Sequence, residues 1–257
     1  MNVNKKNSKL QKLITEWPQG AVLSTKVLDK KDIPRQLVYW YQTHHWIEPV
    51  GNGAYKLVND QIDCFGGIYS LQSHLNMDVH VGGKTSLELL GYAHYISEEM
   101  NTCQLYGKTN KDLPEWFRRY NWGLTIHYKT ATLFQIELYT GFTKYPHKEF
   151  SIRISAPERA IMEMLYRVPS EHGFDESYRI MENLTTLRPE VVQGHLKLCK
   201  SVKVKRLFLF MAERADHAWV HRLHKSKLDL GSGNRQIVKD GVLNKEYKIT
   251  VPREFSE

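Results

Sequence analysis

One segment near the N-terminus, WIEPVGNGAYKL over residues 46–57, constrains the fold of this chain more than any other. Its centre, Asn52-Gly53, readily takes the positive φ angles of a tight β-hairpin turn, so two very short strands are expected around it. An isolated two-stranded hairpin is only marginally stable in water, and this one therefore needs other elements to pack against. The residues expected to anchor it are Trp46, Ile47, Val50, Tyr55 and Leu57.

Three helical segments precede the hairpin. The first, over residues 8–17, carries four apolar residues at helical spacing: Leu10, Leu13, Ile14 and Trp17. Ser24 is a suitable N-cap for a second short helix over residues 25–31, and Pro34 suits the first turn of a third. The third helix is expected to bury Ile33, Leu37, Trp40 and Tyr41. Three helices and a hairpin follow the order of a winged helix-turn-helix; the alternative is a small helical module whose hairpin has no binding role.

The charge of the chain favours a polyanionic partner, nucleic acid first. The 257 residues carry a formal net charge of +8, and the sequence pI is about 9.2. Residues 1–60 contain nine Lys and Arg against five Asp and Glu, so much of the excess lies in the predicted winged helix. A phosphate backbone would be met there. A solvated basic surface without a binding role is the alternative explanation.

A connection rich in small and polar residues, 58–67, leads to a second region of mixed α/β pattern. Helices are expected over IYSLQSHLNM and KTSLELLGYAHY, and strands over DVHVGG, TCQLYGK, LTIHYKT and EFSIRIS. Ser155-Ala-Pro-Glu158 has the form of a capping box for a further helix. More helices are expected around 175–184, 189–199 and 203–224, and a strand turn near Asp240-Gly241. The predicted fold class is α+β, with a winged helix-turn-helix domain (residues 1–60) followed by a mixed α/β C-terminal domain (residues 68–257).

Two motifs suggest chemistry that their surroundings do not support. VGGKTS, residues 81–86, resembles the end of a phosphate-binding loop, but Asp78 stands where that loop needs a glycine, so we interpret it as a strand-to-helix turn. His217, His221 and His224 have the spacing of one helical face. No glutamate adjoins the first of them and cations surround them, so a solvated or nucleic-acid-facing helix is favoured over a metal site. No catalytic residue, metal ligand or cofactor is predicted.

The number and spacing of the cysteines indicate the cellular compartment of the protein. Cys64, Cys103 and Cys199 are far apart and odd in number, which argues against a disulfide framework and for a reducing, intracellular environment. No run of 18 apolar residues occurs, so no membrane span is expected. The N-terminus has positive charges without an apolar segment behind them, unlike a signal peptide.

A second basic run, KLCKSVKVKRLF, lies far along the chain from the predicted winged helix. Five cations fall within ten residues with no acid among them: Lys197, Lys200, Lys203, Lys205 and Arg206. Such a run indicates either a solvated surface or a surface for an anionic partner, which is a nucleic acid or an acidic protein.

The sequence also resembles a known family. AVLSTKVL before the third helix and WIEPVGNGAYKL after it are similar to the winged-helix domain of AbiEi-type antitoxins. LQSHLNMDVHVGGKTSLELLGYAHY, ISAPERAIMEMLY, SVKVKRLFLFMAE and KLDLGSGNRQIVK resemble the C-terminal domain of that family. The similarity covers nearly the whole chain, and the motifs of the second region are more specific than the winged helix.

The resemblance implies a bacterial, cytoplasmic antitoxin of a type IV toxin–antitoxin system, not an enzyme. In that family the N-terminal domain binds inverted repeats upstream of the operon and represses it. The C-terminal domain neutralises a nucleotidyltransferase-like toxin encoded beside the antitoxin, either by direct binding or functionally. The partners implied are double-stranded operator DNA and the toxin, with no membrane, and this is compatible with a monomer in solution that binds DNA cooperatively.

Within the winged helix, the third helix is expected to enter a major groove. Arg35, Gln36 and Tyr39 are the candidates for groove contacts, since arginine and glutamine can pair bidentately with base edges. Three lysines are expected to meet phosphates and set the register on the duplex: Lys26, Lys31 and Lys56.

Two alternatives remain open at this stage. One is an enzyme, a nuclease or a nucleotide-binding protein, that uses the second region; turnover abolished by one carboxylate mutation would favour it. The other is a plain transcriptional repressor with a ligand-sensing second domain. An antitoxin, unlike a simple repressor, rescues growth from the neighbouring gene's product when it is expressed from an unrelated promoter.

Overall fold

The computed structural model describes residues 3–93, 100–107, 112–134 and 140–256. The chain divides into two compact units, each built from three segments. Unit 1 comprises Met1–His80, Gly107–Ile126 and Lys144–Arg153; unit 2 comprises Val81–Tyr106, His127–Thr143 and Ile154–Glu257. The fold class is α+β, as predicted. None of the helices in these described ranges combines the length and the apolar composition that crossing a membrane requires.

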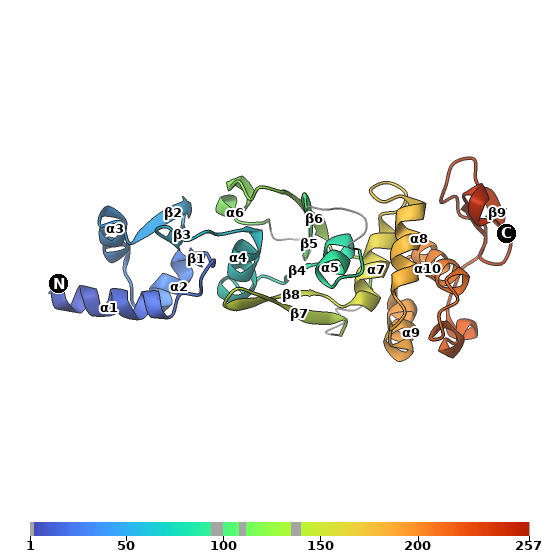
Figure 1. The fold of residues 1–257 in the computed structure, drawn as a ribbon, viewed down its shortest axis with the longest axis horizontal. Helices are drawn as coiled ribbons and strands as arrows, with labels where there is room; N and C mark the ends of the chain where they lie inside the picture. Colours follow the sequence, from blue (N-terminus) through green and yellow to red (C-terminus); the bar gives the residue numbers. More distant parts are fainter. Residues whose placement is uncertain (1–2, 94–99, 108–111, 135–139, 257) are drawn as a thin grey trace. The chain divides into compact units, whose positions relative to one another are not determined.

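Unit 1 begins with a winged helix (Figure 1). Its elements in chain order are α1 (Val3–Thr15), β1 (Leu23–Ser24), α2 (Thr25–Lys30), α3 (Arg35–Thr43), β2 (Ile47–Gly51) and β3 (Ala54–Leu57). The strands form an antiparallel sheet in the order β1-β3-β2, so β1 extends the predicted hairpin to three strands. The core contains buried side chains from the three helices and β2: Leu13, Leu28, Leu37, Tyr41 and Ile47.

The tip of the hairpin is fixed from two sides. Gly53 has a φ of 77°, as the Asn52-Gly53 pattern predicts, and its carbonyl accepts a hydrogen bond from the Thr25 N–H at the start of α2 (2.9 Å). A Cβ added to Gly51 would lie 2.7 Å from the Cβ of Trp116 on α6 (Glu115–Arg119), so β2 packs directly on that helix. The wing is therefore an ordered part of unit 1.

Not all predicted core residues of the winged helix are buried: Trp46 is exposed, and four others are only half-buried, namely Ile14, Trp40, Tyr55 and Leu57. Trp46 is 45% exposed, because the chain turns at His45 (φ 58°) before the strand begins. Trp40 is only half-buried and stacks on the ring of His44 at 4.0 Å, whereas Val38 joins the buried face of α3. Leucine and valine at consecutive positions widen the apolar face, which the spacing i, i+3, i+4 does not anticipate.

The winged helix continues into α4 (Cys64–Tyr69) and the π-helical turn η1 (Ser70–His74) of the same unit. Asp63 caps α4 by accepting hydrogen bonds from the N–H groups of Phe65 and Gly66. Gly66 is in backbone contact with the winged helix, because an added Cβ would lie 1.9 Å from the Gly20 carbonyl oxygen. Residues 58–67 thus lie inside unit 1, and the domain limits 1–60 and 68–257 stay a prediction.

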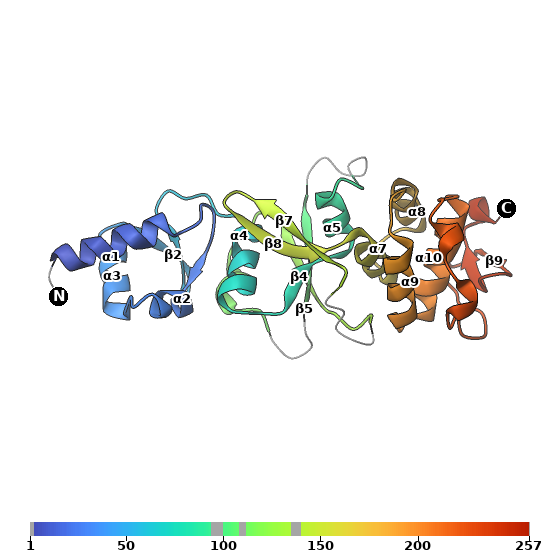
Figure 2. The same cartoon turned by 90° about the horizontal axis from the view of Figure 1, so that it is seen from below.

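A five-stranded sheet has the order β6-β5-β4-β8-β7. The strands are β4 (Val79–Val81), β5 (Thr102–Gly107), β6 (Thr125–Thr130), β7 (Phe142–His147) and β8 (Phe150–Ser155). β4 and β8 pair in parallel, with Val81 opposite Ile154. In unit 1, α4 lies beside β7, where Phe65 contacts Tyr145 (Figure 2). β7 was not predicted from the sequence; its Pro146 is tolerated because the strand lies at an edge of the sheet.

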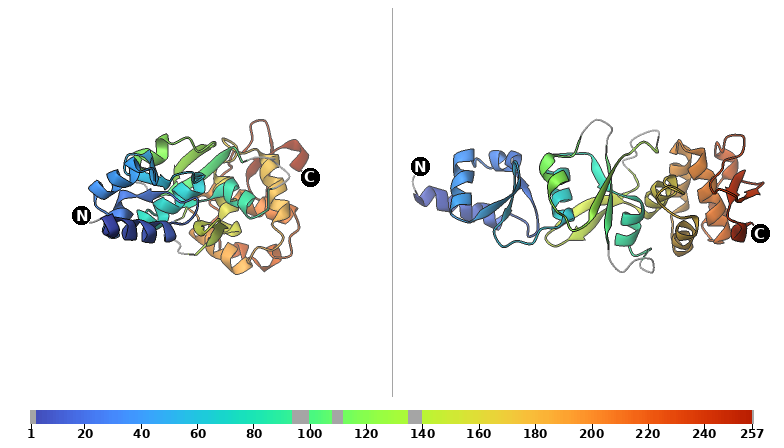
Figure 3. Two further views of the ribbon diagram at one scale, coloured as in Figure 1. Left: turned by 60° about the vertical axis from the view of Figure 1, so that its left-hand side comes forward. Right: turned by 90° about the horizontal axis from the view of Figure 1, so that it is seen from above.

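Unit 2 surrounds its core with helices. They are α5 (Gly83–Leu89), α7 (Pro157–Tyr166), α8 (Phe174–Asn183), α9 (Pro189–Leu198) and α10 (Val202–Arg214), with short turns η2 (Val220–Arg222), η3 (Lys225–Lys227) and η4 (Arg253–Phe255). Helices α7 to α10 pack together, and a hairpin of β9 (Val242–Asn244) and β10 (Ile249–Val251) completes the unit (Figure 3). The core includes fully buried residues of α7, α8 and α10: Ile161, Met164, Ile180, Leu207, Phe208 and Met211.

Three expectations for unit 2 are wrong at the ends of elements. The helix predicted over residues 203–224 ends at Arg214, because Asp216 adopts a φ of 50°, outside the right-handed helical region. The hairpin turn lies between Asn244 and Ile249, which are paired, and not at Asp240-Gly241.

The predicted capping box is the third. Ala156 occupies the N-cap of α7, and the Ser155 hydroxyl donates to Glu163 in place of capping the helix. Glu158 is buried and binds Arg188 (2.8 Å). Both polar side chains of the predicted capping box therefore bond to side chains outside the first turn of α7.

The carboxylate of Glu163, 3% exposed on α7, connects the main elements of unit 2. It accepts hydrogen bonds from the Gly83 N–H at the start of α5 (3.1 Å), the Ser155 hydroxyl at the end of β8 (2.8 Å) and Arg159 Nε (2.7 Å). Arg159 is buried against the ring of Phe134 at 4.8 Å. A negative charge at the start of a helix also complements the helix dipole.

Replacing Glu163 with alanine is therefore expected to lower the free energy of unfolding by about 3–5 kcal/mol, because Arg159 is left as an unpaired buried charge. Urea unfolding followed by circular dichroism measures this. The control is Glu190→Ala in the same unit, whose partner Arg222 is as exposed as Glu190 itself; there a loss of about 1 kcal/mol or less is expected. Equal losses in the two variants would contradict the central role of Glu163.

Candidate nucleic-acid interface

The exposed face of α3 presents the three side chains predicted for groove contacts. Arg35, Gln36 and Tyr39 are all exposed, and Tyr39 is 69% exposed although its ring is large. Pro34 stands directly before the helix, at the N-cap position. The opposite face of α3 is buried in the winged-helix core. The helix can therefore present its outer face to a partner without unpacking.

Two lysines of α2 add positive charge to the winged helix. Lys26 and Lys30 are exposed at the two ends of this short helix. Within the described ranges, Lys26, Lys30 and Arg35 make no ion pair and no side-chain hydrogen bond. Lys30 was not predicted as a contact residue; its only sequence signal is its share in the charge excess of residues 1–60. The side chains of Lys5 and Lys6, which also contribute to that excess, lie outside the described part.

The other two predicted phosphate contacts already have partners inside the protein. Lys31 pairs with Glu16, and this hydrogen bond lowers the pKa of the Glu16 carboxyl. Lys56 pairs with Glu48 across β2 and β3 (2.5 Å) and donates to the Asp60 carbonyl (2.9 Å). Each of these lysines would have to leave a carboxylate in order to meet a phosphate.

The second basic run does not form one surface. Lys197 and Lys200 are exposed, but Lys205 and Arg206 are only 5% and 2% exposed, so their prediction as surface residues is wrong. Lys203 is half-buried and donates to the carbonyls of Tyr166 (2.8 Å) and Val168 (2.7 Å), and burial lowers its pKa. Along α10 the run follows the helical period, so some of its cations necessarily face inward.

The VGGKTS motif is a strand-to-helix turn, as predicted. β4 ends at Val81 and α5 begins at Gly83. A Cβ on Gly82 would lie 2.2 Å from Glu163 Oε2, and a Cβ on Gly83 would lie 2.1 Å from Gln104 Oε1. The Lys84 ammonium binds Glu176 (2.8 Å). The protein's own polar side chains therefore occupy the space that a phosphate would need.

The three histidines of the predicted metal-like spacing do not share a helical face. His217 lies beyond the end of α10, is buried and has Nε2 2.7 Å from the Met181 carbonyl oxygen; His221 lies in η2 and is exposed. No group of three or more metal-ligating side chains occurs in the part of the chain that the structure describes.

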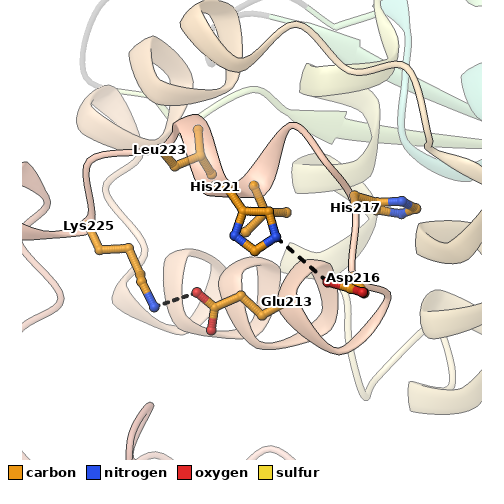
Figure 4. A pocket seen from close by; sticks show the side chains of 7 residues that line it. Glu213, Asp216, His217, His221, Leu223 and Lys225 are labelled. Carbon is orange, nitrogen blue, oxygen red and sulfur yellow. Dashed lines mark ion pairs between the residues drawn. The ribbon is translucent and has the colours of Figure 1, made fainter.

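A pocket of about 420 Å³ lies beside these histidines (Figure 4). Within it, Lys225 pairs with Glu213 (2.5 Å), and the His221 ring lies 3.7 Å from the Asp216 carboxylate. The hydrogen bond from Lys225 to Glu213 raises the pKa of the Lys225 ammonium. The Lys225 and Glu213 charges are therefore already paired within the pocket.

Comparison with solved structures supports the fold. The crystal structure of the RV2827C protein from Mycobacterium tuberculosis is similar over 96% of this chain and 92% of that chain, with a TM-score of 0.59 and 13% sequence identity. At this identity the likeness concerns the fold alone. A comparison with curated proteins finds no significant match.

Family models match both parts of the sequence. Residues 6–98 match the model described as the N-terminal domain of a transcriptional regulator, AbiEi antitoxin. Residues 100–252 match the model described as a transcriptional regulator, AbiEi antitoxin, of type IV toxin–antitoxin systems. The resemblance found in the sequence motifs is thereby confirmed over most of the chain: this protein belongs to the AbiEi antitoxin family of transcriptional regulators of type IV toxin–antitoxin systems.

Proposed function

We propose that this protein represses its own operon by binding inverted repeats of double-stranded DNA through the winged helix. It further neutralises a nucleotidyltransferase-like toxin, encoded beside it, through its C-terminal region. Both activities belong to the bacterial cytoplasm, and both act by binding and not by catalysis. The oligomeric form proposed is a monomer that binds cooperatively on the operator.

The DNA-binding part of the proposal rests on the exposed face of α3. Arg35, Gln36 and Tyr39 project from a helix whose other face is packed, and Arg35 has no internal partner among the described residues. Recognition helices of this class place such side chains against base edges in the major groove. The charge distribution supports the same partner. Unit 1 contains 16 Lys and Arg against ten Asp and Glu, which is six of the eight net positive charges of the chain.

The lysines have graded roles in this proposal. Lys26 and Lys30 contact phosphates directly, because both are exposed and unpaired in the described part of the chain. Lys31 and Lys56 reach phosphates only by leaving Glu16 and Glu48. Phosphate contacts set the register, while Arg35 and Gln36 supply the sequence preference.

Arg35→Ala is expected to weaken binding to the operator by about 1–3 kcal/mol, the scale of one lost bidentate base contact, and to leave binding to unrelated DNA less affected. A gel-shift titration with the DNA upstream of the operon measures both. The control is Arg179→Ala, an exposed arginine of unit 2. An operator affinity equal to that of the unmodified protein would remove α3 from the groove.

Lys26→Ala and Lys56→Ala form a matched pair of substitutions. Removing Lys26 is expected to lower affinity on all sequences and to reduce the slope of log K against log salt by about 0.9, the contribution of one phosphate contact. Lys56→Ala is expected to reduce the slope less, because Lys56 first has to separate from Glu48. Equal reductions would show that the Lys56–Glu48 pair opens on DNA.

Neutralisation is expected to be independent of operator binding. The double variant Lys26→Ala with Arg35→Ala, expressed from an unrelated promoter, should restore growth of cells that express the neighbouring toxin gene as fully as the unmodified protein does. The residual repression of an operator–reporter fusion is measured in parallel. Loss of growth together with loss of repression would favour a simple repressor over an antitoxin.

A further inference from the structure

Helix α6 lies against the wing of the winged helix, the hairpin of β2 and β3, although its residues come far later in the sequence. A Cβ added to Gly51, at the end of β2, would lie 3.0 Å from the Cα of Trp116 on α6, so the two backbones are in direct contact. β2 is an edge strand of the winged-helix sheet, and Figure 1 shows it between α3 and α6. α6 therefore continues unit 1 beyond the wing.

Aromatic packing holds α6 in this position. The Trp116 and Phe117 side chains are 5% and 1% exposed, and the Trp122 indole N–H donates to the Phe117 carbonyl (2.7 Å). A Cβ added to Gly67 of α4 would lie 2.6 Å from the Trp122 ring and 2.9 Å from the Phe117 ring. Because α6 is packed on both the wing and α4, it presents its outer side chains from a fixed position.

The outer face of α6 carries two arginines that are available to an anion. Arg118 is exposed; its Nε donates to the Leu113 carbonyl (3.0 Å), and no carboxylate of the described chain pairs with it. Arg119 pairs with Glu115 (2.9 Å), but these side chains are 80% and 49% exposed, and such a pair contributes little in water. Both arginines follow Trp116 within one helical turn, so they lie within about 5 Å, along the helix axis, of the contact with the wing.

The composition of this face fits a phosphate backbone. Both large apolar residues of α6 are buried and its exposed side chains are charged, whereas a protein interface needs an apolar centre. The segment Gly107–Ile126, which contains α6, has four Lys and Arg against two Asp and Glu. The wing and α3, which the proposed function places on DNA, belong to the same unit. Positive charge next to a DNA-binding surface can neutralise further phosphates of the same duplex.

We propose that Arg118 and Arg119 contact phosphates of the operator next to those that the wing reaches, so that α6 is a further DNA-contacting element of unit 1. This inference rests on the proposed DNA binding. No sequence motif indicated it, because α6 lies outside the winged-helix segment and only folding brings it to the wing. Contacts to the backbone add affinity without sequence preference.

The test is a full-length double variant, Arg118→Ala with Arg119→Ala, titrated on operator DNA and on unrelated DNA. On both, we expect the Kd to rise about fivefold or more and the slope of log K against log salt to fall by about 1–2, the contribution of one or two phosphate contacts. Replacing both arginines with lysine should restore most of the affinity, because lysine also binds phosphate as a point charge.

The matched control removes two exposed arginines of unit 2, Arg179→Ala with Arg253→Ala, and therefore changes the net charge by the same amount. It is expected to leave the Kd and the salt slope unchanged. The thermal unfolding midpoint should be the same in the control and in the α6 variant, because all four arginines are exposed.

The length of the duplex locates the contact. A duplex with a single half-site is trimmed in steps from either end, and the Kd values of the unmodified protein and the α6 variant are compared at each length. The difference between them is expected to disappear on trimming from one end, where the wing lies, and to persist on trimming from the other. A difference that persists on trimming from both ends would contradict a contact beyond the wing.

The outcomes separate this inference from the function on which it rests. If Arg35→Ala weakens operator binding but the α6 variant binds as the unmodified protein does, DNA binding stands and the role of α6 is refuted. A lower unfolding midpoint with an unchanged salt slope also refutes it, since the arginines then serve the dipole of their own helix. Equal weakening by the control indicates an effect of net charge and refutes it too. If the unmodified protein does not bind the operator, the proposed DNA binding itself is refuted.

Discussion

The packing of unit 2 depends on the hydrogen bonds that the buried Glu163 carboxylate accepts. This carboxylate joins the start of α5, which lies 80 residues earlier in the sequence, to the end of β8 and the first turn of α7 through hydrogen bonds of 2.7–3.1 Å. A Cβ on Gly82 would collide with Glu163 itself, and a Cβ on Gly83 would collide with Gln104. A motif that resembles half of a phosphate loop is thus explained by close approach of internal groups.

The basic residues of the chain divide into two kinds by what surrounds them. Lys26, Lys30 and Arg35 are exposed, whereas Lys203, Lys205 and Arg206 direct their charges at backbone carbonyls. Buried cations without carboxylate partners are tolerated because several oriented carbonyls replace their water. The first kind is available to an anionic partner, and the second kind holds nearby backbone segments in place.

The sequence predicted the winged helix almost element for element, because its signals are local. Asn52-Gly53 specifies a turn, Pro34 precedes a helix, and apolar spacing marks the buried faces. The errors within it, such as those at Trp40 and Trp46, concern how deeply a side chain is buried, which the local apolar spacing does not determine. The exposure of Arg35, Gln36 and Tyr39 was also predictable, since helical period alone places them opposite Leu37 and Tyr41.

The sequence by itself determined the fold class, the helix-and-hairpin order of the winged helix and, through its motifs, the AbiEi family. Only the tertiary structure decided which polar residues are free to act. Glu158 and Ser155 bond to Arg188 and Glu163 and do not form the predicted capping box. Lys31 and Lys56 form ion pairs with Glu16 and Glu48. Arg206 is buried and donates to backbone carbonyls. The physical reason is that a backbone hydrogen bond or a helical period acts within a few residues, whereas burial and ion pairing depend on groups that only folding brings together.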